Sequence, residues 1–528
     1  MSVCRRLPLS RVLLKARSHP STKQSAKIMP ASTAHFHTTR PQPERSTRDG
    51  DELSQPLEPA DLRSFWDKLR PEPSTPLHPD LDIGDLRTLL STIIHKRANG
   101  AVAMELHTQQ CCTLYESLDN VRRTKFLHTL AHEFCAPKGK AREAATAYVD
   151  ATKQSEDYAQ TAHLARVLRD SLTPQYTELF DQINRLPNGF AFLVHMRADM
   201  LSHIRLVRDD TACRAMSDAL MKKLETWIIG TLDLKRITWN SPACTIEKLG
   251  QYESVHAVKS WLDVKRRLGS SRRCFGFFHR SVPMEPLVFV WVALTDSISS
   301  NVQSILRDRE PMENEHDAKC AIFYSINSQP GLSGVDLGNF LIKRVVRVLR
   351  ADLPNISTFC TLSPLPKFRS WLEQWLTEGL TNPPANIVST QAAKQLMDLV
   401  PEATTWTMAL KHIMDSRGWT SDQPTLSAME PVVLALGAHY LVNVKRSNCA
   451  FDPVANFHLR NGACLHRVNW RGNSSYNGLR QSLELMCNYN YVLDRIEHNN
   501  ERYVRDGTIA VSGDDPYIAR AMALNAKL

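Results

Sequence analysis

Residues 451–463 read FDPVANFHLRNGA, and this stretch contains His458, whose side chain could carry acid–base chemistry near neutral pH. An imidazole titrates near neutral pH, so it can give a proton as a general acid or polarise a carbonyl oxygen as a hydrogen-bond donor. Pro453 stands near the start of the stretch and Asn461-Gly462 near its end. These residues leave two interpretations open, a catalytic histidine or a structural one.

A second stretch has the composition of an anion-binding loop. Residues 321–354 read AIFYSINSQPGLSGVDLGNFLIKRVVRVLRADLP, which predicts a buried strand, a glycine-containing loop and then a helix. Gly331, Gly334 and Gly338 would let backbone N–H groups approach an anion closely, and the helix N-terminus adds favourable partial charge. The spacing fits neither the Walker nor the Rossmann pattern. The stretch therefore predicts either a phosphate cradle or a plain strand–turn–helix.

The elements that must position these residues change in character near Trp227. Residues 81–227 repeat apolar residues at helical spacing, as in DIGDLRTLLSTIIHKRA and TAHLARVLRDSL. Short apolar, aromatic-rich runs follow, which predict strands that are buried on both faces where they are continuous. The predicted strands are 274–279, 286–294, 321–326, 357–363 and 463–470, with helices including 337–353 and 367–377 between them. We therefore predict an α + α/β fold, with an all-helical domain at 81–227 followed by a mixed α/β domain at 228–500.

The net charge of +10 comes mostly from the N-terminus. Residues 1–43 contain eight Lys and Arg and no Asp or Glu, which leaves 57 basic and 55 acidic residues for the rest of the chain. A nearly neutral body binds polyanions poorly, so we expect no nucleic-acid partner. An acid-free start rich in Arg, Ser and Thr is typical of a mitochondrial transit peptide, although a disordered basic tail is the alternative.

Two further segments complete the predicted organisation of the chain. Residues 44–80 are rich in Pro, Glu, Ser and Asp, which predicts a largely disordered linker, and residues 501–528 form a C-terminal segment whose end bears on location. Its end, AKL, resembles the SKL-type peroxisomal signal, and a chance match of three residues is the alternative. We therefore expect copies in the mitochondrial matrix and the peroxisome, and also in the cytoplasm, with Met29 as a possible second start.

Two classes of structure are not expected. The longest apolar run, 286–294, is as short as a strand, so we expect no membrane span. The twelve cysteines show no C-x-x-C pair and no zinc-like Cys/His spacing, so we expect no metal site and read most of them as buried, reduced side chains.

Longer stretches resemble known families. Residues 321–354 resemble the pyrophosphate-binding loop of the GNAT acetyltransferases, which hold coenzyme A between a strand and a helix that leads to a second strand. Over roughly residues 227–495, a series of ordered motifs resembles the malonyl-CoA decarboxylase family. The motifs are ITWNSPA, HAVKSWLDVKRRLG, DSISSNVQSIL, AIFYSI, GVDLGNFLIKRVV, TLSPLPKF, DPVANFHLRNGA, HRVNW and NYNY.

This resemblance implies a helical oligomerisation domain, a GNAT-like catalytic domain and a homo-oligomer, a tetramer in the family. It also implies conversion of malonyl-CoA to acetyl-CoA and CO2 without a metal or organic cofactor. The implied catalytic residues are Ser363, in LSPLP, and His458, in ANFH. The implied supporting residues are Tyr491, Asp336, Ser325 and Asn456. The implied CoA contacts are Ser333, Gly334, Val335, Asp336, Leu337, Gly338 and Asn339.

This sequence departs from the family pattern at three points. The acidic residue of the loop is Asp336 where relatives have Glu, and it is one methylene shorter. The stretch before His458 begins with Asp452 where relatives have Asn. The motif SPC is SPAC here, so no role for Cys244 can be transferred.

The implied reaction needs the groups that Ser363 and His458 supply. Loss of CO2 leaves electrons at C2 that spread onto the thioester oxygen, and a hydrogen-bond donor aimed at that oxygen lowers the barrier. A histidine near neutral pKa could be the acid that protonates C2, or it could polarise the thioester, while Ser363 contacts the histidine, the carboxylate or the carbonyl.

Two other functions remain possible from the sequence. A GNAT-type acyltransferase would use the same cradle with an amine or alcohol acceptor. A non-catalytic CoA-binding regulator would keep the cradle without turnover. The basic segment VKRRLGSSRR (264–273) is either a solvated face or an attractor for the phosphates of CoA.

Overall fold

The computed structural model describes residues 83–95, 100–154, 157–228, 230–307, 314–378, 386–416 and 418–525. The predicted transit peptide at 1–43, Met29, the predicted linker at 44–80 and the terminal residues 526–528 lie outside the described residues.

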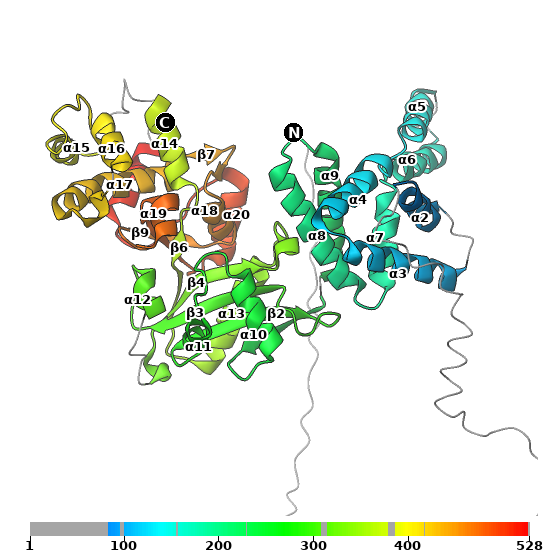
Figure 1. The fold of residues 1–528 in the computed structure, drawn as a ribbon. Coiled ribbons are helices and arrows are strands. Elements are labelled where there is room, and N and C mark those ends of the chain that lie inside the picture. Colours follow the sequence, from blue (N-terminus) through cyan, green and yellow to red (C-terminus); the bar gives the residue numbers. More distant parts are fainter. Residues whose placement is uncertain are drawn as a thin grey trace, which may run out of the picture. The chain divides into compact units, whose positions relative to one another are not determined.

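The first described region, residues 83–228, contains helices, drawn in blue to green in Figure 1. Apolar side chains of α2, α3, α4, α7, α8 and α9 meet in a shared core; α7, for example, buries Tyr176, Leu179, Phe180 and Ile183, which recur at helical spacing. The sequence prediction of a helical domain is therefore confirmed. The helices are α2 (Ile83–His95), α3 (Ala101–Ser117), α4 (Asn120–Glu133), α5 (Lys138–Gln154), α6 (Tyr158–Leu172), α7 (Tyr176–Arg185), α8 (Gly189–Leu206) and α9 (Thr211–Ile228).

The second region is built around an eight-stranded sheet. Its order is β1-β2-β3-β4-β5-β10-β6. Strand β9 is also part of the sheet and pairs with β10. Strands β4 and β5 are parallel, and the other pairs are antiparallel. The strands are β1 (Leu232–Ile237), β2 (Arg272–His279), β3 (Val288–Thr295), β4 (Cys320–Ser328), β5 (Thr358–Thr361), β6 (Ser363–Pro364), β9 (Cys464–Asn469) and β10 (Met486–Asn490).

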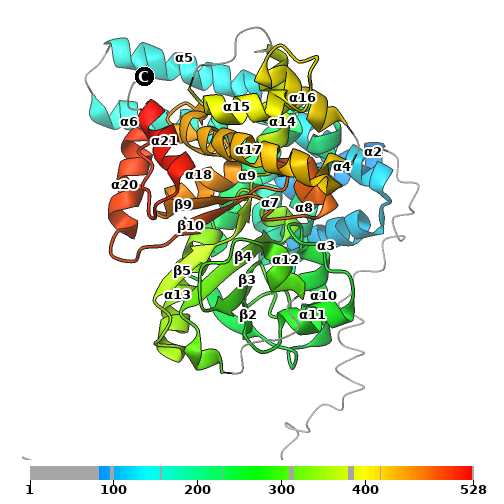
Figure 2. The ribbon, with the colours of Figure 1, turned by 90° about the vertical axis from the view of Figure 1, so that its left-hand side faces the viewer.

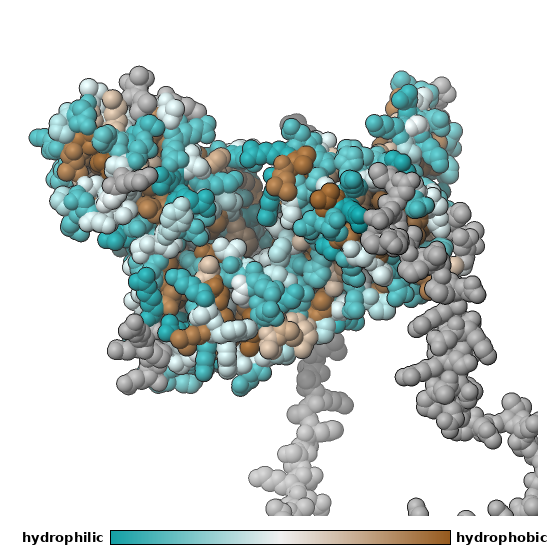
Figure 3. All heavy atoms as spheres, viewed as in Figure 1, coloured by the Kyte–Doolittle hydropathy of each residue, from teal (hydrophilic) through white to brown (hydrophobic). Residues whose placement is uncertain are grey.

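Both faces of the central strands are buried, as their continuous apolar sequence predicts. Alternate residues of β3 enter different cores: Val288, Val290, Val292 and Leu294 belong to the main cluster. Phe289, Trp291 and Ala293 join a second cluster with residues of α10 (Ala243–Tyr252) and α12 (Val302–Arg307). The face drawn in Figure 3 is mostly hydrophilic, with apolar residues in small separate patches.

The predicted strand–loop–helix–strand unit is present. Strand β4 leads through the short helix η3 (Pro330–Leu332) into α13 (Gly338–Asp352), and β5 returns parallel to β4 with Ala321 paired to Phe359. Figure 2 shows α13 beside β5. The fold prediction of a helical domain followed by a mixed α/β domain is confirmed, and this unit has the arrangement expected from the GNAT resemblance.

The remaining elements lie around the sheet. Helix α17 is long and apolar enough to cross a membrane by length and composition, but 72% of its apolar window is buried within the protein, as in a core helix. Helix α20 continues across position 500, and Asn443 at the end of α17 donates to Ala521 O of α21 at 3.1 Å. These elements are α11 (Trp261–Arg267), η2 (Glu315–Asp317), α14 (Phe368–Glu378), α15 (Thr390–Met397), α16 (Trp406–Asp415), η4 (Trp419–Ser421), α17 (Gln423–Asn443), β7 (Lys445–Arg446), β8 (Cys449–Ala450), α18 (Pro453–Arg460), α19 (Tyr476–Ser482), α20 (Ile496–Asp506) and α21 (Pro516–Asn525).

Candidate active site

One cavity of about 900 Å3 joins the glycine loop to the two residues proposed for chemistry. Ser363 and His458 line it at one part, and the loop lines it at another. The helical region also contributes, through Arg205 and Glu225. The predicted site residues among its lining are Ser325, Ser333, Gly334, Val335, Asp336, Gly338, Ser363, Asn456 and His458.

Ser363 is placed by the edge of the sheet where β5 ends. It lies in β6, opposite Cys487 of β10, while Asn490 of the same strand pairs with Cys360 of β5. The chain then continues to Tyr491, whose N–H donates to Phe359 O at 2.8 Å. Strand β10 and the residue after it therefore bring Tyr489 and Tyr491 beside β5, which precedes Ser363, although more than 120 residues separate them in the sequence.

His458 comes to the same place on helix α18. The helix begins at Asp452, whose carboxylate accepts the N–H groups of Val454 and Ala455, both at 2.9 Å. The Tyr440 hydroxyl donates to the same carboxylate at 3.1 Å, and burial raises the pKa of Asp452. Asp452 therefore performs the capping that the relatives' Asn can also perform, so this departure leaves the helix start intact.

A line of hydrogen bonds connects four side chains. The Ser363 hydroxyl donates to Thr361 Oγ1 at 2.9 Å and lies 3.1 Å from His458 Nε2. The other ring nitrogen, His458 Nδ1, lies 2.9 Å from the Tyr491 hydroxyl. The imidazole also stacks on Tyr489, with ring centroids 4.8 Å apart. These contacts fix the orientation of the His458 ring on both edges and on one face.

The hydrogen bonds also indicate where the protons lie. Tyr491 is buried, and its hydroxyl has no other hydrogen-bond partner within the described part of the chain. It therefore donates to His458 Nδ1, because otherwise its own hydrogen would be buried without an acceptor. A neutral imidazole with Nδ1 as acceptor carries its hydrogen on Nε2, so Nε2–H donates to Ser363 Oγ.

The imidazole is neutral at physiological pH. His458 is 3% exposed, and the groups that contact its two nitrogens are uncharged hydroxyls. Burial disfavours the cation and lowers the pKa of His458 to about 3. From the sequence we expect a His458 pKa near neutral. The pKa in the fold is lower because the ring is buried between uncharged hydroxyls, which the sequence does not show.

The other part of the cavity offers backbone donors. The N–H groups of Gly334, Asp336 and Gly338 make no hydrogen bond to other described residues. Gly338 begins α13, a 15-residue helix whose first N–H groups are also without intrahelical acceptors. These groups, together with the partial positive charge of the helix start, form a site suited to a phosphate anion.

Two loop positions need glycine. Gly334 has φ of 88°, a conformation that L side chains rarely adopt. A Cβ at Gly338 would lie 2.6 Å from the Phe457 ring, so this glycine allows the helix start to pack against α18. Leu337, a predicted CoA contact, turns its side chain into the hydrophobic core, and the side chain of Asn339 lies outside the described part of the structure.

Two predicted supporting residues belong to wider hydrogen-bond networks. Ser325 is buried and donates to the Glu253 carboxylate at 2.9 Å, and Asn327 Nδ2 donates to the same carboxylate at 2.8 Å. Asn456 Oδ1 accepts from the Tyr503 hydroxyl at 2.9 Å. Both networks stiffen walls of the cavity, and sequence analysis did not identify Glu253 or Tyr503.

Two more residues of the site were missed. Thr361 is buried and accepts both the Ser363 hydroxyl and the Tyr489 N–H. Asn461 lines the cavity, and its buried Nδ2 has no hydrogen-bond partner among the described residues. The spacing of Thr361 two residues before Ser363 in the predicted strand 357–363 was an available signal, since side chains two apart on a strand lie on the same face.

The basic segment at 264–273 has a structural role at three of its five positions. Arg267 donates to Asp263 at 3.0 Å, Arg273 pairs with Glu315, and Arg272 donates to Ile305 O at 2.8 Å. All three side chains are buried. These three arginines are therefore part of the core around β2. They neither form a solvated face nor attract the phosphates of CoA.

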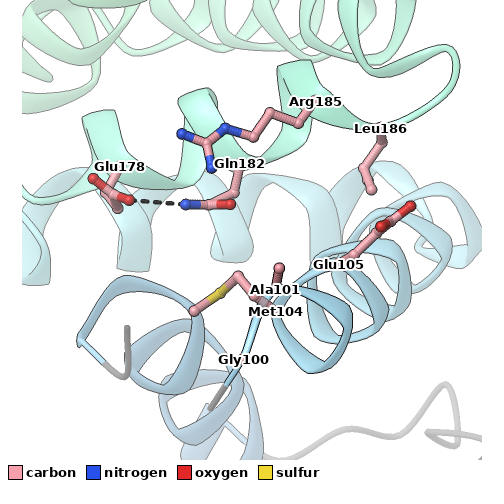
Figure 4. A pocket seen from close by; sticks show the side chains of 8 residues that line it. All are labelled: Gly100, Ala101, Met104, Glu105, Glu178, Gln182, Arg185 and Leu186. Atoms are coloured by element: carbon pink, nitrogen blue, oxygen red, sulfur yellow. Dashed lines mark hydrogen bonds between the residues drawn. The ribbon is translucent and has the colours of Figure 1, made fainter. Parts of the chain in front are cut away.

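A second cavity, of about 540 Å3, lies within the helical region between α3 and α7 (Figure 4). Gln182 donates to Glu178 at 2.9 Å, while Glu105 and Arg185 also line the cavity. Met104, Ala101 and Leu186 supply apolar surface. Among the lining residues that the structure describes there is no histidine, serine or cysteine, whereas the larger cavity is lined by both Ser363 and His458.

Comparisons with known proteins find matches to both the helical region and the α/β region. The family model described as malonyl-CoA decarboxylase C-terminal domain matches residues 230–522, and the one described as malonyl-CoA decarboxylase N-terminal domain matches residues 134–228. The mitochondrial malonyl-CoA decarboxylase of Anser anser anser is 38% identical over 412 residues, which cover 77% of this chain and 82% of that protein. The corresponding protein of Rattus norvegicus is 34% identical over 476 residues, 87% of this chain and 96% of that one.

Solved structures of similar proteins include two bacterial ones. The malonyl-CoA decarboxylase of Rhodopseudomonas palustris matches with a TM-score of 0.70 and 34% identity, over 81% of this chain and 98% of that one. The malonyl-CoA decarboxylase of Agrobacterium vitis matches with a TM-score of 0.70 and 32% identity, over 83% and 99%. The similarity therefore extends over both regions of the chain.

Proposed function

The chain belongs to the malonyl-CoA decarboxylase family, and from this premise we propose that it converts malonyl-CoA to acetyl-CoA and CO2 with Ser363 and His458 at the reacting end of the cavity. The observation that carries this proposal is the single cavity that joins a set of free loop N–H groups to a buried Ser–His–Tyr line. Its volume of about 900 Å3 and its lining suit a substrate with a phosphate end and an acyl end.

The reaction needs one bond to break and one to form. The C2–C3 bond of the malonyl group breaks, CO2 leaves, and the electron pair passes into an enolate whose charge rests on the thioester oxygen. C2 then gains one proton, which comes from solvent in the overall balance. The enzyme must therefore supply a donor to the enolate oxygen and a controlled route for that proton.

We assign the donor role to Ser363. His458 Nε2–H donates to Ser363 Oγ, so the serine hydrogen can turn from Thr361 Oγ1 to the substrate oxygen. In this arrangement a neutral His458 strengthens Ser363 as a donor and does not act as an imidazolium acid. The low pKa of His458 and the Tyr491 hydroxyl on Nδ1 support this reading over that of a charged acid.

We propose that the charge of Asp336 acts on the Tyr491 hydroxyl, which contacts His458. Burial raises the pKa of the Tyr491 hydroxyl well above its usual value, and the negative charge of Asp336 raises it further. Asp336 thus helps to keep Tyr491 protonated and able to donate to His458. We propose this electrostatic role for the shorter acidic side chain of this loop, with Ser325 and Asn456 as supports of the cavity wall.

A turnover experiment tests the function. Purified full-length protein is incubated with malonyl-CoA in D2O, acetyl-CoA is separated by chromatography, and released CO2 is trapped. We expect equal amounts of acetyl-CoA and CO2, and one deuterium in the new methyl group, with no acceptor added. Consumption of malonyl-CoA only in the presence of an amine or alcohol would instead identify an acyltransferase, and binding without turnover would identify a regulator.

We further propose that the enzyme is mitochondrial, as the names of its Anser anser anser and Rattus norvegicus relatives state for those proteins. The acid-free segment 1–43 supports import, and the terminal AKL supports an additional peroxisomal copy. A fluorescent fusion with a free C-terminus should enter mitochondria. Unchanged import after removal of residues 1–43 would contradict the transit-peptide assignment.

The helical region is proposed to form a homo-oligomer, a tetramer by family resemblance. Helix α6 buries none of its side chains in the described structure, and its apolar residues Tyr158, Val167 and Leu172 are exposed. Exposed apolar side chains on one helix support an association surface. Light scattering should give a mass close to four chains, and a monomeric mass would contradict the proposal.

A further inference from the structure

Arg197 of α8 is a buried cation that reaches from the helical region to the glycine loop. We propose that Arg197 is a positioning residue for substrate binding, which holds the loop so that its N–H groups face the phosphates of malonyl-CoA. The inference rests on the proposed function, because it concerns how the substrate is held. It gives the helical region a part in the active site in addition to association.

The contacts of Arg197 join three backbone segments. Its Nε donates to Ser217 O of α9 at 3.2 Å, and its Nη1 donates to Gly331 O at 2.5 Å and to Ser333 O at 2.9 Å. The side chain is 2% exposed. A planar guanidinium can reach carbonyls on two sides at once, which the single ammonium of lysine does less well.

The loop is also pressed closely against α8 and α9. A Cβ at Gly331 would lie only 1.8 Å from Val194 O of α8, so glycine is what permits this approach. A Cβ at Gly334 would lie 3.3 Å from Met221 Sδ of α9 and 3.9 Å from Arg197 Nη2. The helical region therefore forms the back of the loop at both glycines.

This anchoring determines where one of the free donors points. In a trans peptide the C=O of one residue and the N–H of the next point in opposite directions. Because Ser333 O is held by Arg197, the N–H of Gly334 points away from Arg197. Gly334 lines the cavity, and its N–H makes no hydrogen bond to other described residues. Arg197 thus fixes the direction of a donor available to a phosphate oxygen.

Arg197 also contributes charge behind the loop. Its hydrogen-bond acceptors in the described structure are carbonyl oxygens rather than carboxylates. Burial lowers the pKa of Arg197, while the negative charges of Asp218 and Glu225 oppose that shift, so the guanidinium remains a cation. A positive charge at this depth favours an anion on the other side of the loop, as the helix start of α13 does.

The test compares two substrates on three variants. Malonyl-CoA carries the pyrophosphate, whereas malonyl-pantetheine lacks it but has the same reacting end. Arg197→Met should raise KM for malonyl-CoA by about 10-fold or more with kcat changed by less than about 3-fold. Its kcat/KM for malonyl-pantetheine should stay within about 2-fold of the parent enzyme. Arg197→Lys should recover part of the loss, because it keeps the charge and one donor.

Arg123→Met is the matched control. Arg123 is another arginine of the helical region, which donates to Glu116 O at 3.0 Å and to Asp199 of α8 at 3.5 Å, and its contacts in the described structure do not include the loop. It should lower the melting temperature without changing KM for either substrate. Equal losses with both substrates in Arg197→Met, or an unchanged KM for malonyl-CoA, would overturn the proposal.

Two further measurements keep the test decisive. If Arg197→Met does not fold, Arg197→Lys is used, and its affinity for CoA is measured by calorimetry below its melting temperature. Weaker CoA binding is expected, and parental affinity would overturn the proposal. If the parent enzyme does not decarboxylate malonyl-CoA, the proposed function fails, while the calorimetric comparison still tests whether Arg197 positions the loop.

Discussion

Near the glycine loop, the groups that face the cavity are backbone N–H groups, whereas near Ser363 they are side chains. The loop donors are held by glycine conformations and by Arg197 behind them. At the other end, Thr361, Ser363, His458 and Tyr491 hold one another by hydrogen bonds, and each is buried. The difference indicates that changes at the loop should alter substrate binding, whereas changes near Ser363 should alter the chemical step.

The largest effect is expected at the Ser–His pair. Ser363→Ala should lower kcat by about 10²-fold or more, because it removes the donor to the enolate oxygen, while malonyl-CoA still binds. The double variant with His458→Asn should be little worse than the poorer single variant, since the two residues act through one hydrogen bond. Steady-state kinetics on the three variants measure this. Additive losses would show that the residues act independently.

A smaller effect, on binding, is expected at the loop. Gly334→Ala places a side chain at φ of 88°, which costs about 1–2 kcal/mol and should turn the peptide away from its present orientation. KM for malonyl-CoA should rise by about 10-fold with little change in kcat. Gly334 is preferable to Gly338 for this test, because a Cβ at Gly338 would collide with Phe457, which also lines the cavity. A change in kcat alone would contradict the division between the two ends.

A still smaller effect is expected from Thr361→Val. This substitution keeps the shape of the side chain and removes the oxygen that accepts the Ser363 hydroxyl and the Tyr489 N–H. We expect kcat to fall several-fold, because Ser363 loses the hydrogen bond that orients it. Such a bond contributes about 1 kcal/mol. KM should change less than kcat. Melting temperatures of Thr361→Val and Thr361→Ser, the variant that keeps the hydroxyl, distinguish orientation from general loss of stability.

The titration of His458 should contribute little to the pH dependence of kcat. Its pKa is about 3 in the folded protein, below the ordinary value of 6.5, so no loss of kcat from its titration is expected between pH 5 and 8. Its neutral form favours folding fully above pH 6.5, and this contribution is lost as the pH falls toward 3, by about 1.4 kcal/mol per unit. Unfolding of the parent and His458→Asn enzymes at pH 7.5 and 5.5 measures the difference. A kcat limb near pH 6.5 that disappears in His458→Asn would indicate a charged acid instead.

The helices and most strands could be predicted because their signal is local. The continuous apolar runs at 286–294 and 321–326 became β3 and β4, and the apolar stripe after Gly338 became α13. Strand β1 was missed because LDLKRI is polar at alternate positions and is partly exposed at the sheet edge. Strand β10 was missed because MCNYN contains two asparagines, and Asn488 is buried with its amide donating to Thr361 O and Ser299 O.

The site was only partly predictable for a different reason. Ser363 and His458 were named through a family resemblance, but the line that connects them depends on β10 pairing beside β5 and β6. The roles of Thr361, Asn461 and Arg197 depend on contacts between distant segments, which no local pattern encodes. The low pKa of His458 likewise arises from the neutral groups that the fold places around it.

The most direct test of the division between binding and chemistry is made on His458→Asn. Its affinity for malonyl-CoA and its turnover are measured on the same preparation, by calorimetry at a concentration where turnover is negligible and by the release of CO2. We predict a Kd within about 3-fold of the parent enzyme and a kcat lowered by about 10²-fold. A near-normal kcat, or a loss of binding as large as the loss of turnover, would contradict the assignment of His458 to the chemical end of the cavity.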